Sequence, residues 1–232
     1  SPTSEPSEPS EPTSEPSEEP VLRDYSQPGP YSVESNSGNV VVSDCSNGVN
    51  YELYTPVGVS NPPFMVLGHG FLRGGKMVGW GEHYASWGIE VIVPVLCHYN
   101  VLAGVDHEMN GLNMVELAQN HGATEVIYAG QSAGGLAAII AASQDTKAIG
   151  VVGLDATDTE GVPSVPDFIG QQYASSVTVP AFALIGEPSS CNANNNGVTL
   201  FDMMNDSQLI RVSSSDHCDL RVQQIGPVLP CV

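Results

Sequence analysis

Short apolar runs alternate with segments of helical spacing along most of this sequence. The apolar runs lie at 64–67, 89–95, 126–128, 148–154, 179–185 and 208–212, and the helical segments at 76–88, 106–121 and 136–141. Uninterrupted apolar strands are typical of a parallel sheet that is buried on both faces. We therefore predict an α/β fold with a mostly parallel central sheet flanked by helices.

Residues 31–56 show a different pattern, in which polar and apolar positions are mixed. We predict one strand region at 31–44, interrupted by a turn at 36–38, and a second strand at 49–55 that ends at Pro56. The simplest placement is an antiparallel hairpin at the edge of the sheet.

Residues 1–20 contain only Ser, Pro, Glu and Thr, in near-repeats of Ser-Glu-Pro. A segment without apolar side chains cannot offset the entropy cost of ordering, so we predict a disordered linker at 1–24 and a catalytic domain at 25–232. Such tethers commonly separate a catalytic domain from an anchor or another module. We therefore expect an exported protein, secreted or held at the cell surface through this linker.

Charge and hydropathy exclude several functions. The formal net charge is −20, with only six Lys and Arg residues, so the surface repels phosphate backbones and anionic lipids and we expect no nucleic-acid partner. No run of about 18 apolar residues exists, so we expect no membrane-spanning helix. We expect a monomer.

The five cysteines fit an exported protein. We predict the disulfides Cys191–Cys218 and Cys45–Cys231, which leaves Cys97 as a buried free thiol. No Cys-x-x-Cys pair or Cys/His cluster has zinc spacing, so we expect neither a metal nor an organic cofactor.

The candidate chemistry begins with the motif Gly-Gln-Ser-Ala-Gly-Gly at 130–135. A strand precedes it and a helical segment follows it, which is the context of a nucleophile elbow with Ser132 at its apex. Because the chain is rich in Gly and Ser, the motif alone is weak evidence, and the strand–turn–helix context supplies most of its weight.

A serine nucleophile needs a base, and the base needs a carboxylate to orient it. His217 follows the last strand and is the only histidine after Ser132, so we predict it as the base; we expect the other five histidines to be turn or surface residues. For the acid we favour Asp155 at a strand end, with Asp158 and Glu187 as open alternatives.

The oxyanion of ester hydrolysis needs two preorganised donors. We predict the backbone N–H groups of Ala133, directly after the nucleophile, and of Phe71, in the glycine-rich turn at 68–71. The Phe71 side chain would also form an apolar wall beside the acyl group.

Five segments together resemble the chlorophyllase-like and dienelactone-hydrolase-like branch of the α/β-hydrolases, which is related to cutinases and polyester hydrolases. They read VLGHGF, GWGEHYASWGIEVIVP, GQSAGG, GLDATD and DHCD. The resemblance implies the α/β-hydrolase fold, a triad of Ser132, Asp155 and His217, and oxyanion donors at Phe71 and Ala133. The sequence departs from the chlorophyllase elbow GHSRGG at Gln131 and Ala133.

The expected function is a serine carboxylic-ester hydrolase that forms an acyl-enzyme on a small-molecule or polymeric ester. One alternative is a polyester hydrolase or cutinase-like enzyme, and another is a non-catalytic binding module with the same fold. Among enzymes, a thioesterase and an acetyl-xylan or feruloyl esterase also remain open.

Overall fold

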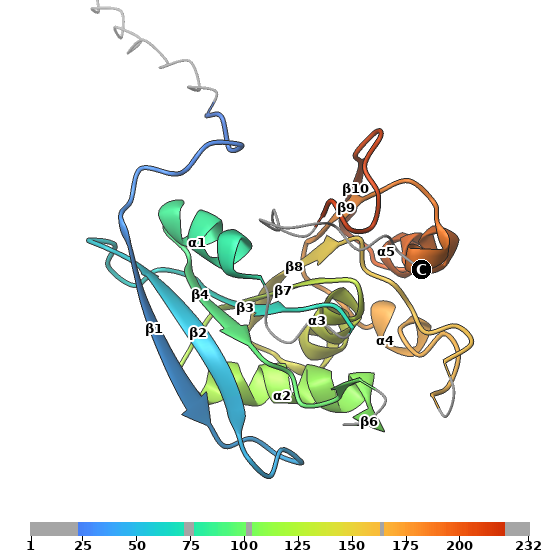
Figure 1. The fold of residues 1–232 in the computed structure, drawn as a ribbon, viewed down its shortest axis with the longest axis horizontal. Helices are drawn as coiled ribbons and strands as arrows, with labels where there is room; N and C mark the ends of the chain where they lie inside the picture. Colours follow the sequence, from blue (N-terminus) through green and yellow to red (C-terminus); the bar gives the residue numbers. More distant parts are fainter. Residues whose placement is uncertain (1–22, 72–76, 101–103, 163–164, 221–232) are drawn as a thin grey trace, which may run out of the picture.

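The computed structural model describes residues 23–71, 77–100, 104–162 and 165–220, so most of the predicted linker lies outside the described residues (Figure 1). A sheet of eight strands runs through it in the order β1-β2-β4-β3-β7-β8-β9-β10. Its strands are β1 (Val33–Val40), β2 (Val49–Pro56), β3 (Phe64–Gly68), β4 (Glu90–Pro94), β7 (Val126–Gln131), β8 (Ala148–Leu154), β9 (Ala181–Ile185) and β10 (Ser207–Arg211). A small second sheet pairs β5 (Tyr99–Asn100) with β6 (Gly104–Val105). The helices are α1 (Val78–Ser86), α2 (His107–Asn120), α3 (Ala133–Gln144), α4 (Gln171–Ala174), the 3-10 helix η1 (Ser190–Asn195) and α5 (Val198–Asp202).

The large sheet is mostly parallel. Strand β2 pairs antiparallel with both β1 and β4, and every other neighbouring pair is parallel. The predicted parallel sheet with an antiparallel hairpin at its amino-terminal edge is therefore confirmed. Each predicted apolar run corresponds to a strand of this sheet, with ends that differ by a few residues.

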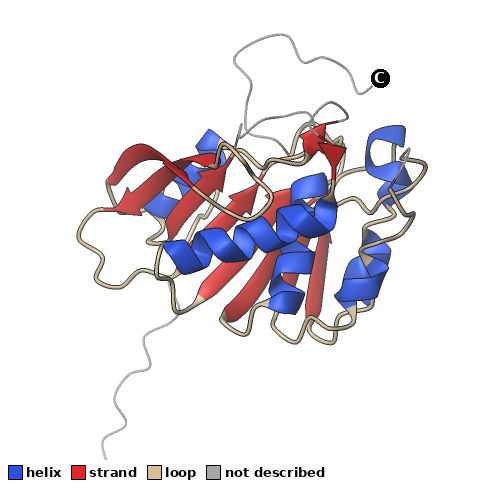
Figure 2. Cartoon of the chain, turned by 90° about the horizontal axis from the view of Figure 1, so that it is seen from below, coloured by secondary structure: helices blue, strands red, loops and turns tan. Residues whose placement is uncertain are grey.

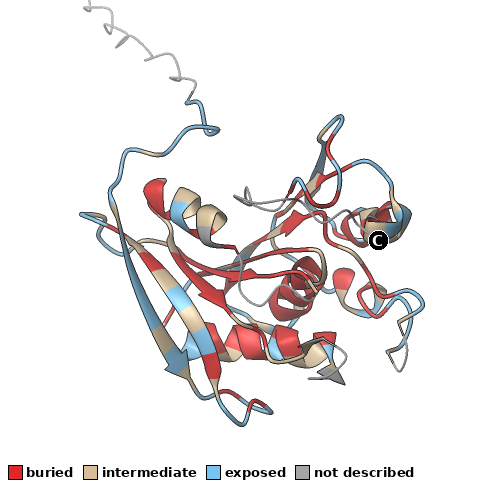
Figure 3. Ribbon diagram, viewed as in Figure 1, coloured by how far each residue is buried: buried red, intermediate tan, exposed pale blue. Residues whose placement is uncertain are grey.

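Helices cover both faces of the sheet, and Figure 2 shows helices lying over the strands. Successive side chains of β3 point to opposite faces: Phe64 and Val66 pack with α2 and α3, whereas Met65 and Leu67 pack on the side of α1. The central strands are buried and the hairpin edge is exposed (Figure 3). This two-sided burial explains why the central strands contain uninterrupted apolar residues.

The two long helices have clear boundaries. Helix α2 begins after Asp106, whose carboxylate accepts a hydrogen bond from the Met109 N–H at 2.9 Å, and it is closed by Gly122 at φ 78°. Helix α3 begins directly after Ser132. None of the helices in the described ranges is long and apolar enough to cross a membrane.

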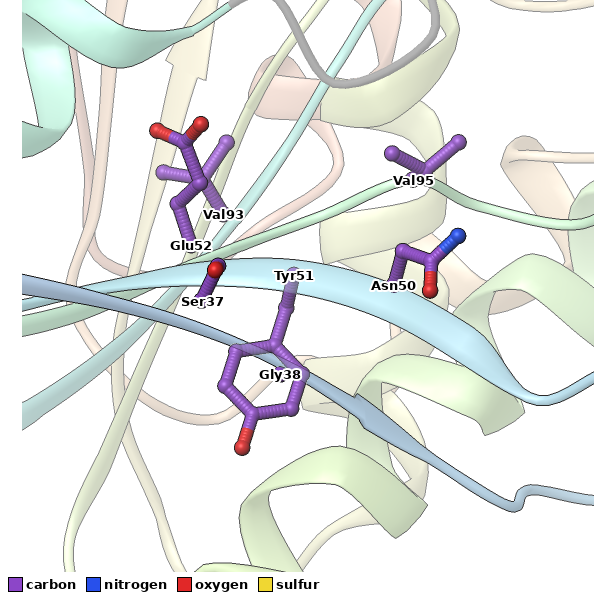
Figure 4. A pocket seen from close by; sticks show the side chains of 7 residues that line it. All are labelled: Ser37, Gly38, Asn50, Tyr51, Glu52, Val93 and Val95. Carbon is purple, nitrogen blue, oxygen red and sulfur yellow. The ribbon is translucent and has the colours of Figure 1, made fainter.

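The predicted turn at 36–38 is wrong. Strand β1 continues through these residues, with Ser37 opposite Glu52 and Gly38 opposite Tyr51, and the chain turns later, between Val40 and Val49. The Tyr51 ring lies beside Gly38 (Figure 4), and both residues line a hollow that the hairpin shares with Val93 of β4. Cross-strand pairing with an aromatic residue therefore outweighs the local turn preference of Asn, Ser and Gly.

The disulfide pattern also differs from the prediction. Cys45 is bonded to Cys97, with the two Cα atoms 6.0 Å apart, so neither the Cys45–Cys231 pairing nor a free Cys97 is correct. The thiol of Cys191 is free, so the predicted Cys191–Cys218 bond is not formed either. Cys231 lies outside the described residues.

The strand order explains the observed disulfide. Because β2 runs antiparallel to β4, the loop before β2 lies beside the loop after β4. The Val95 N–H donates to the Asn50 carbonyl at 2.8 Å, which extends the pairing beyond the end of β4. Cys45 and Cys97 therefore meet where β2 begins and β4 ends. Cysteine spacing alone could not predict this pairing, because it depends on the strand order.

Candidate active site

Ser132 occupies a strained turn between β7 and α3. Its backbone has φ 56° and ψ −123°, a region that non-glycine residues rarely adopt. Backbone strain of this kind costs about 1–3 kcal/mol and persists where the surrounding structure enforces it. The turn places Ser132 at the carboxyl end of the central strands.

Glycines enforce this turn because backbone segments pass too closely for any side chain. A Cβ atom on Gly130 would lie 2.3 Å from the Gly134 carbonyl carbon and oxygen. A Cβ atom on Gly134 would lie 2.4 Å from the Gly68 carbonyl oxygen. The glycines of the predicted elbow are therefore required by contacts between β3, β7 and α3.

The structure brings Ser132, His217 and Asp155 together. Nε2 of His217 lies 2.9 Å from Oγ of Ser132, and Nδ1 of His217 lies 2.7 Å from Oδ2 of Asp155. An ionised carboxylate only accepts hydrogen bonds, so Nδ1 carries the proton and Nε2 presents its lone pair to the serine hydroxyl. Asp155 and His217 are both buried.

Three further residues, to which the sequence assigned no role in the triad, contact Asp155 or His217. Asn192 is fully buried and its Nδ2 donates to Oδ2 of Asp155 at 3.0 Å, while the Gly186 N–H donates to Oδ1 at 3.1 Å. Nε2 of Gln131 lies 3.3 Å from both the carbonyl oxygen and Nε2 of His217. The Asp155 carboxylate therefore has donors on both oxygens besides the imidazole.

Comparisons with known proteins identify the fold. No family model matches the sequence, and no curated protein matches it either. A solved structure assigned as a dienelactone hydrolase, from Klebsiella pneumoniae subsp. pneumoniae, matches with a TM-score of 0.65 at 13% identity, over 80% of this chain and 88% of that chain. The chain has the α/β-hydrolase fold. Est1E from Butyrivibrio proteoclasticus also matches, with a TM-score of 0.61 at 14% identity, over 78% of this chain and 90% of that chain.

The alternative acids lie elsewhere in this α/β-hydrolase fold. Oδ1 of Asp158 accepts hydrogen bonds from the Thr159 and Gly170 N–H groups, both at 2.8 Å. Glu187 is half exposed, and its carboxylate lies 4.0 Å from Arg211. Among the three predicted acids, Asp155 is the one in contact with His217.

The early glycine turn approaches the nucleophile closely. A Cβ atom on Gly70 would lie 3.2 Å from Cβ of Ser132, which places the backbone before Phe71 directly beside the elbow. His69 fixes this turn: the Leu96 N–H donates to Nε2 at 3.0 Å, so the protonated Nδ1 donates to the Gly70 carbonyl at 2.8 Å. Burial lowers the pKa of His69 and favours this neutral form.

The other histidines differ partly from the expectation of turn or surface positions. His69 and His107 are buried, whereas His83, His98 and His121 are more accessible. In the described ranges, no group of three or more His, Cys, Asp or Glu side chains is arranged to hold a metal ion.

A cavity of about 220 Å³ opens beside the nucleophile. Ser132, Ala133 and Phe71 line one part of it, so the predicted nucleophile and both predicted oxyanion donors share this space. The remaining lining includes the polar residues His107, Asp158 and Glu160. Its volume is below the range of about 300–1,000 Å³ typical of drug-sized ligand sites, which favours a small substrate group.

Proposed function

We propose that this protein hydrolyses carboxylic esters, with Ser132 as nucleophile, His217 as general base and Asp155 as the carboxylate that orients it. The observation that carries the proposal is the hydrogen-bonded chain from Ser132 Oγ to His217 at 2.9 Å and on to Asp155 at 2.7 Å. A serine hydroxyl is weakly nucleophilic alone, and a histidine held in this tautomer accepts its proton.

The reaction follows from the positions of these groups. As Oγ of Ser132 attacks the ester carbonyl, its proton moves to Nε2 of His217, and the N–H groups of Phe71 and Ala133 stabilise the oxyanion. Collapse of this intermediate breaks the ester C–O bond, and His217 returns the proton to the leaving alcohol. Water then attacks the acyl-enzyme with His217 again as base, which releases the acid and restores Ser132.

Within ester hydrolases we assign the chain to the chlorophyllase-like and dienelactone-hydrolase-like branch. The segment GLDATD, which contributes Asp155, supports this assignment, and so does the likeness to the structure assigned as a dienelactone hydrolase.

Polyester or cutinase-like activity is tested by incubating the protein with short aliphatic polyesters and, in parallel, with soluble esters. Release of soluble acid from the polymer by the wild type but not by Ser132→Ala would place polyesters among the substrates.

The deciding experiment compares the wild type with Ser132→Ala on p-nitrophenyl butyrate and on a fluorophosphonate probe. We expect the variant to lose about six orders of magnitude in kcat, since the nucleophile and base act as one unit. Ser143→Ala, on the same helix α3, is the matched control and should keep probe labelling. A folded wild type that neither hydrolyses the ester nor reacts with the probe would instead indicate a non-catalytic binding module.

We also propose that the protein is exported. The bond between Cys45 and Cys97 supports this, because disulfides persist mainly in oxidising compartments. Fractionation of the source cells tests it: we expect the protein in the medium or at the cell surface, with the Cys45–Cys97 cross-link intact. Recovery of reduced protein from the cytosol would contradict export.

A further inference from the structure

Two residues that line the cavity each have a buried polar atom without a hydrogen-bond partner. Among the described residues, five buried side-chain nitrogen or oxygen atoms are without a partner, and two of the five belong to the cavity residues His107 and Asp158. The atoms are Nδ1 of His107 and Oδ2 of Asp158, on side chains that are 5% and 3% exposed. An unsatisfied buried polar group costs about 1–3 kcal/mol, so such groups are retained mainly where a ligand or water satisfies them.

The Asp158 carboxyl accepts its hydrogen bonds from Thr159 and Gly170 through one oxygen. Oδ1 accepts from these two N–H groups, which fixes the carboxyl plane and leaves Oδ2 unpartnered. Burial raises the pKa of Asp158, and its backbone hydrogen bonds lower it. Oδ2 is therefore the oxygen left for a hydrogen bond with a substrate, as an acceptor or, when protonated, as a donor.

His107 provides the second unpartnered atom. It is the first residue of α2, directly after the capping residue Asp106, and its imidazole is buried in the cavity wall. Burial lowers the pKa of His107, which favours the neutral ring with one acceptor nitrogen.

The charge of the cavity limits what it can bind. Asp158 and Glu160 contribute carboxyl groups, and none of the described residues that line the cavity is Lys or Arg. A substrate carboxylate or phosphate would find no cation there and would meet like charge at Glu160. An unsubstituted alkyl chain would leave both polar atoms unsatisfied.

We propose that His107 and Asp158 bind a neutral hydroxyl group of the substrate, so that this site prefers small hydroxylated esters to their alkyl analogues. A hydroxyl both donates and accepts, so it can pair with the Asp158 oxygen and the His107 nitrogen whichever of the two carries the proton. This proposal rests on ester hydrolysis at Ser132, and it deepens that function by naming the substrate class.

The experiment measures kcat/KM for two matched substrate pairs. The first pair, p-nitrophenyl 3-hydroxybutyrate and p-nitrophenyl butyrate, places the hydroxyl on the acyl side. The second, 2-hydroxyethyl butyrate and ethyl butyrate, places it on the alcohol side. We expect a preference of about tenfold or more for the hydroxylated ester in one of the two pairs, because a site built to hydrogen-bond a hydroxyl discriminates against the analogue that lacks it.

Variants then assign the preference to the two residues. Asp158→Leu and His107→Phe should each bring the ratio close to one, whereas Asp158→Asn should keep it because its amide retains a hydrogen-bonding group in place of Oδ2. Asn113→Leu is the matched control: it also removes a buried unpartnered oxygen, Oδ1, from helix α2, but Asn113 does not line the cavity. This control should keep the wild-type ratio.

Equal kcat/KM within both pairs for the wild type would overturn the proposal while leaving ester hydrolysis intact. Loss of activity on all four esters in Ser132→Ala tests only the nucleophile. Failure of the hydroxyl-binding proposal is therefore distinguishable from failure of the proposed ester hydrolysis. A wild-type preference that survives Asp158→Leu and His107→Phe would also overturn the assignment. If Asp158→Leu does not fold, the wild-type ratio and His107→Phe still decide the outcome.

Discussion

The elbow around Ser132 and the amino-terminal hairpin each contain a glycine with no room for a methyl group, yet the neighbours differ. At Gly134 the nearest atom to an added Cβ is the Gly68 carbonyl oxygen, at 2.4 Å. At Gly38 it is the Tyr51 hydroxyl, at 2.5 Å. The backbone of β3 is hydrogen-bonded to a strand on each side and therefore moves little, whereas the end of a tyrosine side chain can rotate. The elbow is therefore fixed by backbone contacts, and the hairpin by side chains that can adapt.

Among the substitutions that test this comparison, the largest effect should come from Asp155→Asn, which changes the chemistry of the elbow region without changing its packing. An asparagine in this place favours the wrong imidazole tautomer, and a loss of about 10⁴-fold in kcat is the magnitude known for such a change in a serine-protease triad. Steady-state hydrolysis of p-nitrophenyl butyrate measures it, with Glu187→Gln as the matched control. A fall of equal size in the Glu187 variant would move the orienting role away from Asp155.

In the hairpin region the largest effect should be on stability and not on catalysis. Cys45→Ser removes the Cys45–Cys97 bond, which links residues 52 positions apart, and such removals cost about 2–5 kcal/mol. Urea unfolding of the oxidised wild type and the variant gives the difference, and kcat of the folded variant should match the wild type. Loss of kcat without loss of stability would show that the hairpin also controls the chemistry.

Gly134→Ala should lower both the stability and kcat. The added methyl group meets the Gly68 carbonyl, so we expect a loss of about 1–3 kcal/mol in unfolding free energy from overpacking. We also expect a lower kcat, because relief of the clash moves the start of α3 and with it the Ala133 N–H. Thermal unfolding and p-nitrophenyl butyrate hydrolysis measure the two effects, and wild-type values for both would show that the elbow backbone adapts as the hairpin does.

Asn192→Ala tests a residue that positions Asp155. Removing its donor at 3.0 Å should lower kcat by about 10- to 100-fold, because a hydrogen bond to a charged group is worth about 1.5–3 kcal/mol. KM should change little, since Asn192 does not line the substrate cavity. A purely structural role would lower the unfolding midpoint and leave kcat per folded molecule unchanged, so both quantities are measured. Asn194→Gly, which removes an exposed side chain from the same asparagine-rich segment, serves as the control.

Sequence alone identified the features that local residues determine. The turn at Ser132 was predictable because its strand, turn and helix are contiguous. Its contact with His217 was predictable because His217 is the only histidine downstream of Ser132, whereas Asp155 was the favoured one of three candidate acids. The strand at 36–38 was missed because Tyr51 of the neighbouring strand outweighs local turn preference. The role of Asn192 could not be predicted from the sequence, because several asparagines lie nearby. Asn192 differs from them by being buried in contact with Asp155, which only the structure shows.

Gly38→Ala should have the smallest effect, and it separates the two kinds of glycine most directly. The new Cβ displaces the Tyr51 hydroxyl by rotation of an accessible side chain, while alanine lowers the entropy of the unfolded chain, so the change in unfolding free energy should be below about 1 kcal/mol. A double-mutant cycle with Tyr51→Ala measures the coupling: Gly38→Ala should become more favourable once the ring is absent. A cost for Gly38→Ala as large as that of Gly134→Ala, unchanged in the Tyr51→Ala background, would show that backbone contacts also fix the hairpin glycine.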